Sequence, residues 1–102
     1  MSRDRLFLLR PGFEDPDYPN AVFYCWHCAL MEGVLASFPE LAERLEIIRI
    51  AWPRPRSEVV ELLGEENQSL PVLVFAEGGF VNDKDAILAA LSARHGFPLP
   101  HP

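Results

Sequence analysis

Cysteine is scarce in this chain, which has two in 102 residues, Cys25 and Cys28. One pair so close together cannot join distant segments, so a small secreted scaffold held by several disulfides is excluded. Hydrophobic residues make up 49% of the chain, enough to bury a core without such links. The composition therefore predicts one domain that spans residues 1–102.

Long apolar runs and concentrated positive charge are also missing. The longest apolar run, residues 70–76, is too short to cross a membrane. The apolar stretch at residues 6–9 is too brief for the core of a signal peptide. The net charge is -6 and the nine Lys and Arg residues are scattered, which disfavours a nucleic-acid surface. We expect a cytoplasmic protein that binds neither membranes nor nucleic acid.

Short apolar segments bounded by turn residues predict four strands. They cover residues 5–10, 45–50, 70–75 and 80–81. The third of these is continuously hydrophobic, so we expect it to be central in the sheet. The proline-rich segment at residues 11–20 predicts a loop, and a loop this long in a compact domain is expected to cover part of the molecule.

Between the strands the hydrophobic spacing predicts helices. From Cys25 onward, apolar residues recur at three- and four-residue steps, and they are Leu30, Met31, Val34, Leu35 and Phe38. Pro39 restarts a short helix, Ser57 and Gly64 are suitable ends for another, and Asn82 or Asp83 caps the last, at residues 84–94. The order predicts an α/β fold of thioredoxin-like βαβ-ββα layout, with a four-stranded mixed sheet flanked by helices.

The segment CWHC, residues 25–28, holds the most reactive side chains of the sequence. If a helix begins at Trp26, then Cys25 lies at its N-terminus, where unpaired N–H groups and the helix dipole favour a thiolate. An imidazolium at His27 would favour the anion further. Cys25 would attack a disulfide, and Cys28, one turn into the helix, would resolve the mixed disulfide.

Two other interpretations of this pair stay open. The cysteines can be small buried hydrophobic residues with no chemistry. A zinc site needs about four ligands, and the chain adds only His27, His95 and His101, without a second ligand pair at suitable spacing. We therefore predict no metal site within one chain, while a metal shared between two chains stays open. For His95 and His101 we expect ordinary solvated positions.

The segments CWHC and SLPVLVF, together with the closing helix, resemble the thioredoxin-like superfamily. The resemblance implies that Pro71 follows a cis peptide bond and faces the cysteines, and that Leu70 offers backbone groups to a bound thiol. The second half is also similar to glutaredoxins and to the N-terminal domain of glutathione transferases. That similarity implies a site for the γ-glutamyl end of glutathione at Asp83 and Lys84, with glutathione as a co-substrate and no resident cofactor.

Over nearly its whole length the chain resembles a bacterial thioredoxin-like family catalogued as domain of unknown function 3088. The segments PGFEDPDYPN, FYCWHCALMEGVLASFPELAERL and AWPRPR carry this resemblance. Our leading hypothesis is a thiol–disulfide oxidoreductase that acts on a protein disulfide or a small thiol, with Tyr24 and Trp26 flanking the site. The alternatives are a non-catalytic binding module of the same fold and a metal-binding protein. The sequence leaves the oligomeric state open.

Overall fold

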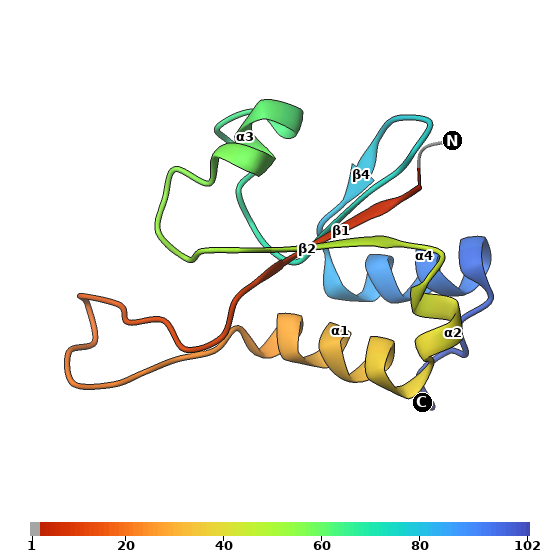
Figure 1. Cartoon of the computed structure of the whole chain (residues 1–102), viewed down its shortest axis with the longest axis horizontal. Coiled ribbons are helices and arrows are strands. Elements are labelled where there is room, and N and C mark those ends of the chain that lie inside the picture. The colour runs from red at the N-terminus through yellow and green to blue at the C-terminus, as the bar shows by residue number, and fades with distance from the viewer. Residues whose placement is uncertain (1–2) are drawn as a thin grey trace.

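The computed structural model describes residues 3–102, and a four-stranded mixed sheet lies at its centre (Figure 1). The strand order is β2-β1-β3-β4. Strand β1 (Arg5–Leu9) pairs in parallel with β2 (Glu46–Ile50) and antiparallel with β3 (Val72–Val74), and β4 (Phe80–Val81) pairs antiparallel with β3. The prediction of an α/β fold with a four-stranded mixed sheet is confirmed, and β3 is an interior strand as expected.

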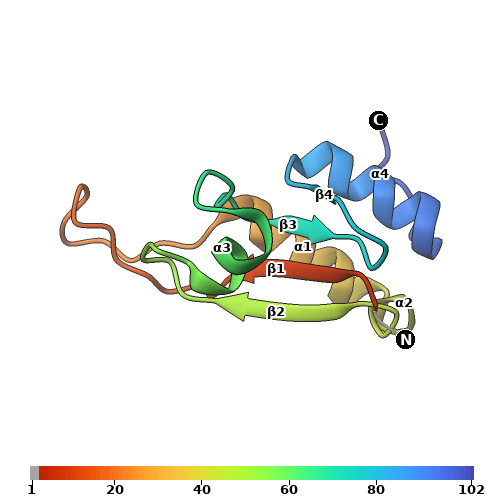
Figure 2. The ribbon, with the colours of Figure 1, turned by 90° about the horizontal axis from the view of Figure 1, so that it is seen from above.

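Helices cover both faces of this sheet (Figures 1 and 2). Helices α1 (Trp26–Ser37) and α4 (Lys84–His95) lie on one face, and α3 (Ser57–Leu63) lies on the other. The short helix α2 (Pro39–Ala42) follows α1 directly, as the proline at its start predicts. No helix within residues 3–102 is long and apolar enough to cross a membrane.

Strand β1 is buried on both faces, which explains its continuous hydrophobic sequence. Leu6 and Leu8 belong to the core cluster that includes Met31 of α1 and neighbouring residues of α4. Phe7 points the other way and packs in the cluster of Val59 from α3. The alternation along one strand therefore fixes which helix lies on which face.

Several element boundaries differ from the sequence-based expectation. Strand β3 is shorter than predicted, because Pro71 lacks the N–H that a ladder position requires. Ser57 does not cap α3: the cap residue is Arg56, and the Ser57 hydroxyl contacts Glu58 instead. Leu30 was expected on the buried face of α1, but it is exposed, since that face is centred on other positions.

The long segment between β1 and α1 forms an arm. Phe13 and Phe23 pair across it in an antiparallel bridge, and the Phe13 ring stacks on Trp52 with centroids 5.4 Å apart. The arm projects away from the sheet instead of covering it, as both views show (Figures 1 and 2). Its base nevertheless joins the start of α1 and so lies beside the cysteines.

Candidate functional site

The sulfur of Cys25 occupies the N-terminus of α1. Cys25 is the N-cap residue, with extended backbone angles, and its side chain is partly exposed. The Cys28 N–H donates a hydrogen bond to Cys25 Sγ at 3.2 Å. The first-turn N–H groups of a helix have no partner within the helix, so a sulfur that accepts one of them gains most when it is negatively charged. The geometry predicted for Cys25 is present.

Cys28 lies in a different environment. Its side chain is 2% exposed and packs in the main core cluster, and its sulfur accepts a hydrogen bond from the Leu9 N–H at 3.4 Å. Burial, followed by the hydrogen bond with Cys25, raises the pKa of the Cys28 thiol to about 12. Both cysteines are free thiols. The site therefore pairs one accessible sulfur with one protected sulfur.

The segment before β3, which contains Leu70 and Pro71, lies next to Cys25. The Cys25 thiol donates toward the Leu70 carbonyl oxygen, with the two atoms 3.9 Å apart. The Leu70–Pro71 peptide bond is cis, as the thioredoxin-like resemblance implies. A second cis bond, Arg54–Pro55, was not expected from the sequence. Leu70 therefore lies where its backbone borders the exposed sulfur.

A cavity of about 250 Å³ opens beside both cysteines, on the side of the arm's base. At one edge, Glu32 forms a two-point ion pair with Arg49 of β2, at 2.7 and 2.8 Å. This guanidinium lowers the pKa of Glu32, so the carboxylate stays ionised. The lining residues are Leu9, Pro11, Tyr24, Cys25, Cys28, Ala29 and Glu32. The cavity is thus apolar along its walls and acidic at one edge.

The aromatic residues around the cysteines are exposed. Tyr24 and Trp26 have 63% and 68% of their surface accessible, so both can contact a bound molecule. The His27 ring lies against the Trp26 ring, with centroids 3.9 Å apart. Its Nε2 atom is buried and has no hydrogen-bond partner within residues 3–102, and no hydrogen bond joins it to Cys25. The tuning role assigned to His27 stays a prediction.

The two residues assigned to glutathione binding have other partners here. Asp83 caps α4 by accepting a hydrogen bond from the Ala86 N–H at 3.1 Å, which confirms Asp83 as the cap. Lys84 pairs with Asp85 at 3.0 Å. Neither residue lines the cavity at the cysteines. The structure therefore brings Tyr24, Cys25 and Cys28 together and leaves Asp83 and Lys84 outside that group.

Arg56 is a buried charged residue that the sequence analysis missed. It is 6% exposed, and its guanidinium donates to the backbone carbonyls of Trp52 at 2.9 Å and Gln68 at 2.6 Å. Burial lowers the pKa of Arg56, whereas the charges of Cys28 and Cys25 act in the opposite direction. The only sequence signal is its place in the proline-rich segment AWPRPR, which gives no hint of burial.

The part of the chain that the structure describes holds no group of three or more His, Cys, Asp or Glu side chains placed to bind one metal ion. A metal at the two thiolates would need further ligands from a second chain. The arrangement thus places one partly exposed sulfur, one buried sulfur and a backbone carbonyl beside an open cavity.

Comparison with known proteins identifies the family of this chain without assigning an activity. No curated protein and no solved structure matches it significantly. One family model matches residues 3–99, nearly the whole chain. The mixed sheet and the cysteine pair at the start of a helix are consistent with the thioredoxin-like layout expected above. The chain belongs to the family described as protein of unknown function, DUF3088.

Proposed function

We propose that the protein is a thiol–disulfide oxidoreductase. The observation that carries the proposal is the asymmetry of the cysteine pair. Cys25 Sγ is partly exposed and accepts the Cys28 N–H at the start of α1, whereas Cys28 is buried with a thiol pKa of about 12. A nucleophile must be accessible and ionised, and a resolving thiol must stay protonated until the mixed disulfide forms.

The reaction begins with the Cys25 thiolate. Its sulfur attacks one sulfur of a substrate disulfide, forms a mixed disulfide, and releases the other substrate sulfur as a thiolate that takes up a proton. Cys28 then loses its proton to solvent in the adjoining cavity and attacks Cys25 Sγ. This step releases the second substrate thiol and leaves a Cys25–Cys28 disulfide. Two electrons have passed from the protein to the substrate, and an external thiol such as glutathione restores the dithiol.

The neighbouring residues support substrate binding. The Leu70 carbonyl borders Cys25, Tyr24 lines the cavity with the two cysteines, and Trp26, next to Cys25 in the chain, is exposed. The cavity of about 250 Å³ has room for one side chain or a small thiol next to the reacting sulfur. These features favour a protein disulfide or a small thiol as substrate, as the sequence predicts.

Trapping of the mixed disulfide tests this proposal. The Cys28→Ser variant, incubated with oxidised glutathione, is expected to gain the mass of one glutathione at Cys25, because the resolving thiol is absent. The wild-type chain is expected to form an internal disulfide instead, and Cys25→Ser should give neither product. Intact-mass and peptide mass spectrometry distinguish these species. Labelling of Cys28 in Cys25→Ser as fast as labelling of Cys25 in Cys28→Ser, or no labelling of Cys25, contradicts the proposal.

A second candidate function is a binding module that performs no turnover. Tyr24 at an apolar cavity and the exposed Trp26 favour it, because such rings contribute strongly to interfaces. The Cys25→Ser variant distinguishes the two candidate functions. A binding module keeps its affinity for a captured partner in Cys25→Ser, whereas a partner held through a mixed disulfide is lost in that variant and is released from the wild-type protein by a reducing agent.

A further inference from the structure

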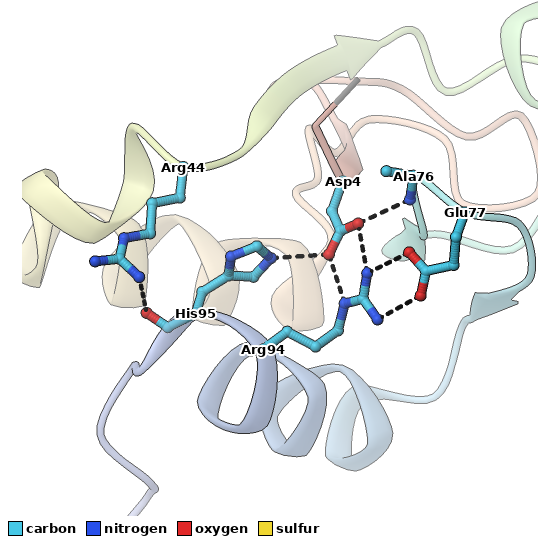
Figure 3. Close-up of polar contacts among 6 residues, drawn as sticks. All are labelled: Asp4, Arg44, Ala76, Glu77, Arg94 and His95. Atoms are coloured by element: carbon cyan, nitrogen blue, oxygen red, sulfur yellow. Dashed lines mark hydrogen bonds and ion pairs between the residues drawn. The ribbon is translucent and has the colours of Figure 1, made fainter. Parts of the chain in front are cut away.

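A second polar centre lies at the opposite end of β1 from the cysteines (Figure 3). Asp4 is 3% exposed, and its carboxylate accepts hydrogen bonds from the Ala76 N–H at 2.8 Å and from Arg94 at 2.6 and 2.9 Å. His95 Nε2 lies 2.8 Å from Asp4 Oδ2. The prediction that His95 is solvated is wrong, because its ring is held by a carboxylate from a distant part of the chain.

The state of Asp4 determines the proton position on His95. Hydrogen bonds from Arg94, and smaller ones from Ala76 and His95, hold the pKa of Asp4 well below its usual range. An ionised carboxylate only accepts hydrogen bonds, so His95 Nε2 must donate its proton to Asp4. The ring edge that carries Nδ1 has no hydrogen-bond partner within residues 3–102. This edge of the ring lies on the side of Arg44 (Figure 3).

These groups line a cavity of about 440 Å³, which Cys25 and Cys28 do not line. Arg94 is already paired with Asp4 and Glu77, but Arg3 and Arg44 have no carboxylate partner within residues 3–102. The lining residues are Arg3, Asp4, Arg44, Ala76, Arg94 and His95. Three guanidinium groups therefore meet two carboxylates, Asp4 and Glu77, which leaves positive charge in excess here although the net charge of the chain is -6.

The two unpaired arginines keep most of their donors. Arg3 donates from one nitrogen to backbone carbonyls, the nearer being Glu43 O at 3.1 Å, and Arg44 donates to His95 O at 3.4 Å. The second contact offsets the negative pole of α4, which ends at His95. A guanidinium has five N–H donors, so several on each arginine are available to a ligand.

We propose that this cavity binds a phosphate group with at least three unesterified oxygens, in inorganic phosphate or in a phosphomonoester. The charged oxygens would accept hydrogen bonds from Arg3 and Arg44, as guanidinium groups readily provide for phosphate. A phosphodiester fits less well, because it has a single negative charge and two free oxygens, whereas a phosphomonoester carries a charge of about -1.5 to -2 at neutral pH. The site is independent of the cysteines, so it stands whether or not the protein is an oxidoreductase.

Titration of the isotope-labelled protein with inorganic phosphate, at fixed ionic strength and neutral pH, tests the proposal by NMR. We expect saturable shifts of the backbone amide signals of Arg44 and His95 with phosphate and with O-phosphoserine. Dimethyl phosphate, a diester, should produce no saturable shift. If dimethyl phosphate binds as well as phosphate, or the shifts do not saturate, the specific site is refuted and only general attraction of anions is present.

Matched variants locate the site. Arg44→Gln removes a guanidinium that makes one long contact to the protein, and loss of its charged hydrogen bonds should weaken phosphate binding about tenfold. Arg3→Gln is also expected to weaken phosphate binding, and it replaces Arg44→Gln as the test if that variant is unstable. Arg54→Gln, an exposed arginine outside this cavity, is the control and should leave the affinity unchanged. Affinity retained in both Arg3→Gln and Arg44→Gln overturns the assignment.

Discussion

Two charged side chains are buried in the described part of the chain, and their surroundings differ. Asp4 has a partner for each carboxylate oxygen, and the main partner, Arg94, carries the opposite charge. Arg56 contacts only the neutral carbonyls of Trp52 and Gln68, with no carboxylate partner within residues 3–102. One buried charge is thus neutralised in the folded protein, while the other is not.

The difference indicates different roles. A paired buried charge links distant segments of the chain. Removal of one partner leaves the other without the interaction that offsets its desolvation. A buried cation without an anionic partner maintains a positive potential, which benefits an anion that forms nearby. Burial and the charge of Arg54 lower the pKa of Arg56, and a thiolate at Cys28 or Cys25 acts in the opposite direction, so the cation and an ionised cysteine favour each other. We therefore expect Asp4 to determine stability and Arg56 to influence thiol reactivity.

The largest effect is expected from Asp4→Ala. It removes the acceptor for Arg94, for His95 and for the Ala76 N–H, and loss of these hydrogen bonds to a charged group should lower the free energy of unfolding by about 2 kcal/mol. Urea denaturation measures the change. In the folded variant, the alkylation rate of Cys25 should equal that of the wild type. A large loss of that rate would show that the two ends of the sheet are coupled.

The contribution of Asp4 to the free energy of unfolding should also depend on pH. The pKa of Asp4 is lower in the folded protein than its ordinary value, so its stabilising effect is complete above about pH 4 and declines as the pH falls below that value. We expect the free energy of unfolding to fall more steeply on acidification in the wild type than in Asp4→Asn. The variant keeps the smaller effect of Glu77, whose pKa Arg94 also lowers. Parallel curves for the two proteins would contradict the prediction.

The same contrast explains how much of the molecule was predictable. The strands, the helix that begins at Trp26 and the cap at Asp83 follow from local spacing and capping preferences, which one stretch of sequence contains. The contact of Asp4 with Arg94 joins residues 90 apart, and no local pattern encodes it. Burial of Arg56 likewise depends on how the loop before α3 packs. Sequence reasoning therefore located the cysteines but neither buried charge.

Arg56→Gln tests the second half of the comparison, with a smaller expected effect. Loss of the buried positive charge should slow alkylation of Cys25 several-fold at neutral pH, because the thiolate becomes less favourable. Arg56→Lys keeps the charge and should recover part of the rate, whereas a purely structural role would not distinguish the two variants in this way. The control is Arg44→Gln, which removes an exposed arginine from the cavity at the other end of the sheet. Equal rates in Arg56→Gln and the wild type would show that Arg56 serves only to anchor the loop.

The smallest effect is expected from Glu32→Gln, which alters the cavity without removing a buried group. The negative charge of Glu32 contributes to the raised pKa of Cys28, after the larger effects of burial and Cys25. The substitution also releases Arg49, whose positive charge favours a thiolate, so both changes should lower the pKa of Cys28 below about 12. The thiolate absorbance of Cys28, followed during an alkaline titration in a Cys25→Ser background, measures it.

Glu40→Gln, which removes an exposed carboxylate from α2, provides the matched control for this titration and should leave the midpoint unchanged. A lower midpoint in Glu32→Gln alone would show that the acidic edge of the cavity helps to keep Cys28 protonated until the mixed disulfide forms. An unchanged midpoint would mean that burial beneath Cys25 is sufficient. In that case the protection of the resolving thiol comes from its place in the core, and the Glu32–Arg49 pair only joins α1 to β2.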